Sequence, residues 1–447
     1  MSNQHDAVPD VPPTAYPITT PDPLAAEEQP PAVTGTDRPP VGAGYIWLLI
    51  LATFGVYVAF VTPIAISLAI KVDQIAPGNE ASLGYVLGIG SLAAMLVGPL
   101  VGVLSDRTRS RLGRRKPWII AGTVVGTLAL VLIAQASTIP VLILGWVLAQ
   151  IGWSTVVSTL LTTQADRLPE SQRGKVGGLN GFATMAGPVI GSAIGGSLAT
   201  QPLLLFLIPG AIGVLFAALF VLFIRESDTR VATFDHQLSA NLLAKKYLYD
   251  PRRYPDYSWN WLGRFLFNFG LTLNTAFTAF FFADRLGLDV TAIGGVVAIA
   301  GLLGVLATIT GAIGGGFLSD RVRRRRVFVL TGGVAFAAGA LLQAASTSLP
   351  MLLTGTFVAA IGIGIFSAVD QALLLDVLPE RDTDAGRFMG INGFSTTLPQ
   401  AVAPLLAPAI LAIGAAESLN YPLLYVIAAV FTVAGGLVIL LRVRSVN

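Results

Sequence analysis

The amino-acid sequence predicts an all-α membrane protein with twelve transmembrane helices in two parallel six-helix repeats. Three observations lead to this prediction: the composition, a series of long apolar segments and an internal repeat. Hydrophobic residues make up 54% of the 447 residues, charged residues only 12%, and the mean hydropathy is +0.72. In soluble domains roughly a quarter of all residues are charged, so this chain cannot cover a globular surface with polar groups.

Twelve segments are long and apolar enough to cross a bilayer, since a transmembrane helix needs about 20 mostly apolar residues. We therefore expect an N-terminal bundle over 44–224, a cytoplasmic linker over 225–259 and a C-terminal bundle over 260–447. The predicted spans are 44–70, 82–105, 118–137, 140–163, 175–199, 203–224, 260–283, 291–318, 327–346, 350–377, 386–412 and 421–441.

The basic residues indicate how these spans are oriented. Of the 28 lysines and arginines, all but Lys71, Arg264 and Arg285 fall on one side of the predicted membrane, together with both chain ends. Short cytoplasmic loops retain positive charge, so we expect a multi-pass protein of the cell membrane with both termini in the cytoplasm. The one-sided distribution also favours twelve spans, because one missed helix would mix the loops of the two sides.

The first 43 residues differ from the rest of the chain. Residues 1–40 contain ten of the 27 prolines, six acidic residues and one arginine. Such a segment cannot bury a core, and it lacks the basic and apolar regions of a secretory signal. We predict a disordered, proline-rich cytoplasmic tail over 1–43.

The two halves of the chain repeat one another. GVLSDR at 102–107 matches GFLSDR at 316–321, and DRLPE at 166–170 matches DVLPE at 376–380. GKVGGLNGF at 174–182 matches GRFMGINGF at 386–394, and the three offsets are 214, 210 and 212 residues. Each half thus starts and ends on the same side of the membrane, an organisation found in transporters whose halves rock about a central site.

Two stretches carry a family resemblance. GVLSDRTRSRLGRRKPW (102–118) resembles the signature loop of the major facilitator superfamily, in the version of the sucrose transporters and the glycoside–pentoside–hexuronide:cation symporters. The run from VDQALLLDVLPE to NGFSTTLPQAVAP (369–404) resembles actinobacterial members of the same branch. The resemblance covers the chain after residue 43. It implies the superfamily's fold and alternating-access transport.

The charged loop after the second span suggests a contact between the halves. Asp106 follows a helix whose C-terminal carbonyls would repel it, whereas a neighbouring helix N-terminus would attract it. The resemblance places Asp106 near Arg387 and Asp320 near Lys175. The basic residues have an alternative explanation, because positive charge also orients helices and contacts anionic lipid. The predicted conformational latch comprises Gly102, Asp106, Arg107, Arg111, Gly113, Arg114, Arg115, Asp320 and Arg321.

Two ionisable residues lie well inside predicted spans, Arg264 in the seventh and Asp370 in the tenth. Both are about 8 to 9 Å from the cytoplasmic ends of their helices, at about 1.5 Å per residue, so they can form an ion pair. Either Asp370 exchanges a proton or shapes the substrate site, with Arg264 adjusting its proton affinity, or the pair is purely structural. Asp166 and Asp376, at helix ends, are interpreted as caps or loop anchors.

Polar residues inside the spans predict the substrate site. In the fourth span they recur every four residues and so share one helix face, and a similar stripe runs from Arg264 along the seventh. Hydroxyl and amide groups beside aromatic rings suit an uncharged polyhydroxylated ligand, although Ser and Thr in membrane helices often bond only to their own backbone. The predicted substrate-binding residues are Tyr57, Gln150, Trp153, Ser154, Ser158, Asn180, Asn268, Thr275, Gln371 and Asn392.

These features predict a secondary transporter that imports a sugar, a glycoside or disaccharide, together with protons. The alternatives are proton-driven efflux of a drug or metabolite, and uniport. The resemblance would also allow sodium coupling of the melibiose type, but the first six spans lack the carboxylates that it uses.

Other classes of function lack their sequence signatures. There is no HExxH zinc motif, no GxSxG nucleophile elbow and no GxxxxGK[ST] phosphate loop. The chain has no cysteine, and His5 and His236 lie outside the spans. We expect no enzymatic activity, metal, cofactor or nucleic-acid partner. The expected partners are a small-molecule substrate, a coupling proton and membrane lipid, and the oligomeric state stays open.

Overall fold

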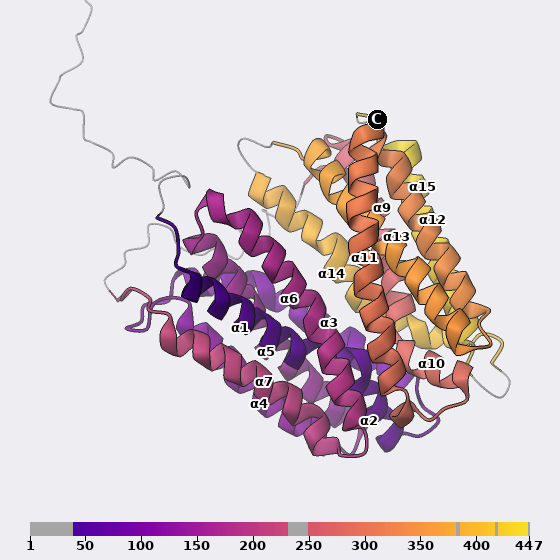
Figure 1. Ribbon diagram of the computed structural model, residues 1–447, viewed down its shortest axis with the longest axis horizontal. Helices are drawn as coiled ribbons and strands as arrows, with labels where there is room; N and C mark the ends of the chain where they lie inside the picture. Colours follow the sequence, from indigo (N-terminus) through magenta and orange to yellow (C-terminus); the bar gives the residue numbers. More distant parts are fainter. Residues whose placement is uncertain (1–38, 231–248, 381–384, 416–418, 446–447) are drawn as a thin grey trace, which may run out of the picture.

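The computed structural model describes residues 39–230, 249–380, 385–415 and 419–445. Within these residues the secondary structure is entirely helical (Figure 1). Most of the predicted tail, and the middle of the predicted linker, lie outside the described residues. The elements of the first half are α1 (Ala43–Thr62), η2 (Pro63–Ser67), α2 (Leu68–Ile75), α3 (Ser82–Asp106), α4 (Lys116–Gln135), α5 (Ile139–Arg167), α6 (Glu170–Ser197) and α7 (Pro202–Phe223).

The second half repeats this order of helices. Its elements are α9 (Pro255–Ala276), α10 (Thr278–Leu286), η3 (Val290–Ala292), α11 (Gly294–Val322), α12 (Arg325–Ala344), α13 (Leu349–Val377), α14 (Ala385–Leu411) and α15 (Tyr421–Arg442). Many of these helices begin with proline in their first turn, where the missing backbone N–H costs nothing.

Ten helices in the described part of the chain are long and apolar enough to cross a membrane. The bent pair α9–α10, with an angle of 51° between its parts, would add an eleventh. The predicted span 175–199 corresponds to α6, whose eight glycines and polar first turns make it less apolar than those ten helices. The protein is therefore a multi-pass membrane protein, and twelve spans remain a prediction.

Equivalent helices pack alike in the two halves. Helix α1 packs against α6 and α7 as α9 packs against α14 and α15, and α4 packs against α5 as α12 packs against α13. Glycines allow close packing of the helices in these last two pairs, α4 with α5 and α12 with α13. A Cβ on Gly152 would lie 2.4 Å from the backbone nitrogen of Gly126, and one on Gly362 would lie 2.3 Å from that of Phe336. Figure 1 shows the two groups of helices side by side, in purple and in orange to yellow.

The halves meet through α3 with α14 and through α6 with α11. These contacts lie at the end away from the basic loops. A Cβ on Gly84 would lie 2.3 Å from the carbonyl oxygen of Pro404, and one on Gly196 would lie 2.5 Å from Gly294 Cα. The Tyr421 hydroxyl also donates across the interface to the Glu80 carboxylate.

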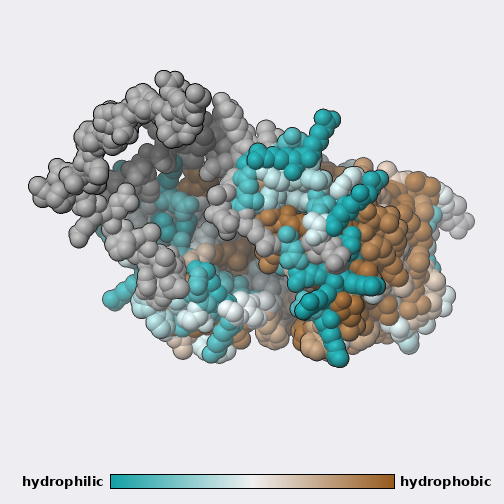
Figure 2. Space-filling model, turned by 90° about the horizontal axis from the view of Figure 1, so that it is seen from above, coloured by the Kyte–Doolittle hydropathy of each residue, from teal (hydrophilic) through white to brown (hydrophobic). Residues whose placement is uncertain are grey.

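At the opposite end, where the basic loops lie, the helices of the two halves stand apart. A Cβ added to glycines in the last turns of α3 or the first turns of α6 and α14 would meet no atom within 4 Å; these are Gly98, Gly102, Gly174, Gly177, Gly178, Gly181 and Gly393. Figure 2 looks onto this face and shows hydrophilic residues over both halves. The conformation is therefore closed at the end of Glu80 and open toward the basic loops.

Candidate functional site

A cavity of about 430 Å³ lies between the halves. Helices α1, η2 and α6 of the first half and α9 to α13 of the second contribute its walls, which are mainly apolar. Its polar lining residues are Ser192, Asn274, Thr275, Thr278, Thr308, Gln343 and Thr356. An apolar cavity with a few placed polar groups is the usual form of a small-molecule site.

Three of these residues form a hydrogen-bonded chain. Asn274 Nδ2 donates to Gln343 Oε1 at 3.0 Å, and Gln343 Nε2 donates to Thr356 Oγ1 at 2.8 Å. The chain joins α9, α12 and α13, and it fixes the orientation of both amides. Sequence reasoning missed Asn274 and Gln343; their only signal was an amide side chain inside an apolar segment.

The predicted ion pair between Arg264 and Asp370 is present. Arg264 Nη1 donates to Asp370 Oδ2 at 2.6 Å, and Asn260 Nδ2 donates to Asp370 Oδ1 at 3.2 Å. Asp370 is 1% exposed and Asn260 is fully buried, whereas the Arg264 side chain is 20% exposed. Sequence reasoning missed Asn260, which lies one helical turn before Arg264 on the same face of α9.

The polar stripe of α9 connects this ion pair to the cavity. Thr275 lines the cavity, and Arg264 lies eleven residues earlier, about 16 Å along the helix. Asn268 Nδ2 donates to the Arg264 carbonyl at 2.8 Å, and Thr275 Oγ1 donates to the Leu271 carbonyl at 3.0 Å. The Thr275 hydroxyl proton and one of the two Asn268 amide protons are thus used within the helix, which leaves the second Asn268 N–H and the oxygen atoms for a ligand.

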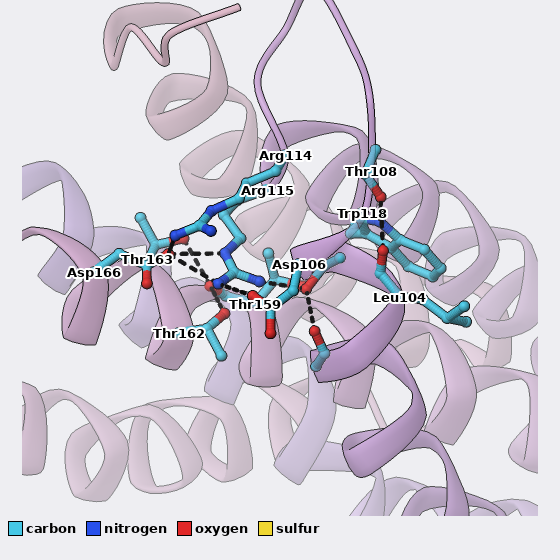
Figure 3. A network of polar contacts seen from close by, with 12 residues as sticks. Leu104, Asp106, Thr108, Arg114, Arg115, Trp118, Thr159, Thr162, Thr163 and Asp166 are labelled. Atoms are coloured by element: carbon cyan, nitrogen blue, oxygen red, sulfur yellow. Dashed lines mark hydrogen bonds and ion pairs between the residues drawn. The ribbon is translucent and has the colours of Figure 1, made fainter. Parts of the chain in front are cut away.

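On the basic face, one arginine joins two carboxylates in each half. Arg115 is 4% exposed; its Nη2 lies 2.5 Å from Asp106 Oδ1 and its Nε donates to Asp166 Oδ2 at 3.0 Å (Figure 3). Arg325 makes the equivalent contacts, with Asp320 at 3.4 Å and with Asp376. The helix-end aspartates, interpreted from sequence as caps or loop anchors, are thus ion-pair partners of the loops.

A sequence profile of the Major Facilitator Superfamily matches residues 43–315 and 303–447, which is nearly the whole described chain. The chain belongs to the Major Facilitator Superfamily. Its members are membrane transporters, so the protein is a transporter and not an enzyme.

Curated relatives match this superfamily member only in part. The chain is 32% identical over 87 residues to a general alpha-glucoside permease of Schizosaccharomyces pombe, which is 20% of this chain and 14% of the permease. It is 32% identical over 98 residues to myo-inositol transporter 1 of Cryptococcus neoformans, 22% of this chain and 17% of that protein. It is 50% identical over 48 residues to an uncharacterised symporter of Synechocystis, 10% and 9% of the two chains. The chain thus spans less than a fifth of the length of these relatives.

Solved transporters share the fold over almost the whole chain. A nucleoside transporter superposes with a TM-score of 0.72 at 14% identity, covering 90% of this chain and all of the other. A D-xylose–proton symporter superposes with a TM-score of 0.69 at 16% identity, covering 90% and 99%. Likeness at this identity shows the fold alone.

In this major facilitator chain, most predicted substrate residues of the first half lie away from the cavity. Trp153 is fully buried in a slot left by Gly126 and Gly213, because α4 and α7 pack on either side of it. Gln150 is 3% exposed, and its Oε1 has no partner among the described residues. In this conformation both side chains belong to the interior of the first bundle. Their predicted contact with substrate would need a rearrangement.

Other predicted residues line smaller spaces or stand exposed. Tyr57 and Asn180 line a pocket of about 20 Å³ between α1, α5 and α6. Ser158 Oγ approaches the Gly98 carbonyl at 3.5 Å, and Ser154 beside it is half-buried on α5. On the second half, Gln371 is exposed and Asn392 is 4% exposed. Of the ten predicted substrate residues, only Thr275 therefore lines the large cavity.

The predicted latch takes a different form in this conformation. Asp106 pairs with Arg115 and Asp320 with Arg325, so among the described residues each of these two ion pairs stays within one half. The close approach of α3 to α14, at Gly84 and Pro404, lies at the other end of these helices. Gly113 has a φ of +86°, and a Cβ there would lie 2.3 Å from Glu226, so glycine is required where the linker covers the loop. Arg111 and Arg321 are exposed.

Proposed function

We propose that the protein imports a sugar together with protons by alternating access. In this proposal twelve spans cross the cell membrane, both termini lie in the cytoplasm, and bundles 44–224 and 260–447 rock about the central cavity, joined by the linker 225–259. The names of several relatives support a sugar: an alpha-glucoside permease, a myo-inositol transporter and a D-xylose–proton symporter.

The single observation that carries the proposal is the Asp370 site. Among the described residues Asp370 is the one buried carboxylate, and it lies inside a membrane-spanning helix. A buried ionisable group inside a membrane is costly and typically belongs to an ion or proton pathway. In this proposal the carboxylate is deprotonated while it pairs with Arg264, and protonation would release the guanidinium and leave Asn260 as the remaining partner. This exchange would link the proton to a change in α9.

The sugar would bind in the central cavity. Sugar hydroxyls both donate and accept hydrogen bonds, which matches the amide and hydroxyl groups of Asn274, Gln343 and Thr356. The apolar walls would contact the C–H faces of the ring. The stripe of α9 would then transmit substrate binding to the Arg264–Asp370 pair.

The proposal is tested with cells expressing the protein in weakly buffered suspension. Sucrose, maltose and other glycosides are added one at a time while the external pH is recorded. Alkalinisation with one sugar, lost in Asp370→Asn, is the expected result. Asp250→Asn, which removes an exposed carboxylate of the linker, is the matched control and should retain the signal. A flat trace for every sugar would contradict proton–sugar uptake for that panel.

One observation favours a second candidate, proton-driven efflux of an apolar compound. The cavity is lined mainly by side chains such as Val61, Ile64, Phe282 and Phe336. Lower cell accumulation of an apolar dye, dependent on Asp370, would distinguish efflux from sugar uptake. Transport that proceeds without any pH change would instead indicate uniport.

A further inference from the structure

The loop between α11 and α12 forms an arginine-lined hollow of about 460 Å³ at the basic end of the second half. Its lining consists of Val322, Arg323, Arg324, Arg326, Val327 and Leu440. The three arginines come from the loop and the start of α12, and Leu440 belongs to the last turn of α15. Charged and apolar side chains thus meet at the ends of membrane-spanning helices.

Two of the three arginines of this hollow have no carboxylate partner among the described residues, whereas Arg326 interacts electrostatically with Asp256. The side chains of Arg323 and Arg324 are exposed and form no ion pair or hydrogen bond with any described residue. The carboxylates nearest in the fold are engaged: Asp320 and Asp376 with Arg325, and Asp256 with the backbone nitrogens of Arg444 and Ser445. Arg326 donates through Nη1 to the Val443 carbonyl at 2.5 Å.

The equivalent loop of the first half is built differently. There the first residues of the linker cover the loop: Glu226 accepts from the Arg115 backbone nitrogen, and Thr229 Oγ1 donates to the Thr108 carbonyl at 2.9 Å. Its left-handed position is occupied by glycine, Gly113. The linker therefore covers the loop between α3 and α4. No described segment covers the equivalent loop between α11 and α12 in the same way.

The backbone of the second loop points to a role for its charge. Arg323 ends α11 in the left-handed conformation, with a φ of 56°, where glycine is strongly preferred. A side chain at such a position is disfavoured by its own Cβ. An arginine at this helix end adds charge to the hollow at a conformational cost that glycine would avoid.

We propose that this hollow binds the headgroup of an anionic phospholipid. The guanidinium groups of Arg323 and Arg324 bind the phosphate through paired N–H donors. The exposed side chains of Val322 and Val327 contact the glycerol and the upper acyl chain. A free phosphate ion would use the arginines and leave the apolar side of the hollow without a partner. The site is independent of the transported substrate and of the coupling ion.

The test uses the purified full chain in detergent and native mass spectrometry with phosphatidylglycerol, phosphatidylcholine or inorganic phosphate added. Arg323→Gly relaxes the left-handed residue while removing its charge, so it should not impair folding; Arg324→Gln removes the second charge. Each should lower retention of phosphatidylglycerol about fivefold, the effect of one basic residue near an anionic headgroup. Arg252→Gln, an exposed arginine elsewhere on the same face, is the control and should retain the lipid.

Selective loss of phosphatidylglycerol in both loop variants, with the control unchanged, supports the site. Equal retention of phosphatidylglycerol and phosphatidylcholine, or unchanged retention in the loop variants, would overturn it. Displacement of the lipid by millimolar inorganic phosphate would also overturn the lipid assignment, because it would show that the arginines bind phosphate without help from the apolar side chains.

Discussion

Asn260 and Asp370 are 110 residues apart in the sequence and share a hydrogen bond in the protein interior. The carboxylate has two donors, one on Asn260 and one on Arg264, while Asn260 Oδ1 and Arg264 Nε have no partner among the described residues. The cluster is thus held together but incompletely satisfied. An unpaired polar atom in a low-dielectric interior is costly, so a new partner for either atom would be favourable.

Removal of the amide should weaken the cluster. Asn260→Ala leaves one oxygen of a buried carboxylate without its donor, which costs about 1 to 3 kcal/mol, so the apparent melting temperature of the purified protein should fall. In an Asp370→Asn background the same substitution should cost less, because the charge is gone. Equal losses in both backgrounds would show that Asn260 acts through packing alone.

At the scale of elements, glycine contacts decide how closely helices approach. A Cβ on Gly152 would lie 2.4 Å from Gly126 N and 2.7 Å from the Gly122 carbonyl, whereas one on Gly98 would meet no atom within 4 Å. Gly152→Ala should therefore lower the free energy of unfolding by about 1 to 3 kcal/mol, the usual cost of overpacking. Gly98→Ala is the control. Thermal unfolding of both variants in detergent measures the difference. Similar melting temperatures would contradict the claim that Gly152 is needed for the close approach of α4 and α5.

A second element-scale feature is the closed end of the molecule. Glu80, in the turn between α2 and α3, accepts a hydrogen bond from Tyr421 and shares a hollow of about 490 Å³ with Asp73, Asp284 and Asp289. Burial raises the pKa of the Glu80 carboxyl, its neighbours Asp73 and Asp284 raise it further, and the Tyr421 hydrogen bond opposes both. Lys71 and Arg285 donate to backbone carbonyls instead.

This pKa shift predicts the direction of a pH effect. A carboxyl whose pKa is raised in the closed state favours closure at low pH, and this contribution is lost as the pH rises through the raised pKa. The native chain has no cysteine, so spin labels on Asn79→Cys and Leu288→Cys report the opening of this end. The distance between them should increase with pH in the wild type and not in Glu80→Gln. A pH-independent distance in the wild type would contradict the role of Glu80.

The helices and their equivalence in the two halves could largely be predicted from sequence. The bend in α9–α10 and the partners of the buried polar residues could not, for physical reasons. The repeated SDR and NGF motifs predicted which helices are equivalent, because each motif lies at the same helix end in both halves. The 51° bend between α9 and α10 left no proline or glycine signal. Trp153 was predicted to contact substrate but is buried between α4 and α7. Hydropathy alone does not indicate which face of an apolar helix packs against neighbouring helices. The partners Asn274 and Gln343 are 69 residues apart, beyond any local pattern.

At the scale of the whole molecule, the structure holds one of the conformations that alternating access requires. The halves touch near Glu80 and Tyr421 and stand apart near the basic loops. In this conformation Asp106 and Asp320 bond to arginines of their own halves. When the basic ends close, we expect these carboxylates to exchange partners toward Arg387 and Lys175.

This exchange predicts the behaviour of latch variants. Asp106→Asn and Asp320→Asn should each reduce transport turnover about tenfold or more. Expression and melting temperature should change little, because both carboxylates are exposed and Arg115 and Arg325 keep their ion pairs with Asp166 and Asp376 in this conformation. Gly102→Ala should likewise be tolerated in this state, with free space around its Cβ, and should slow transport if α3 approaches α14 on closure. Normal turnover in all three variants would argue against a latch.

The central claim is that Asp370 couples protons to the substrate, and reconstituted vesicles test it most directly. Once a transported sugar is known, accumulation driven by a pH gradient and sugar exchange without a gradient are measured for wild type and Asp370→Asn. The account predicts that the variant keeps exchange and loses gradient-driven accumulation, because rocking survives and coupling does not. Accumulation equal to that of the wild type would contradict it and leave the Arg264–Asp370 pair a structural contact.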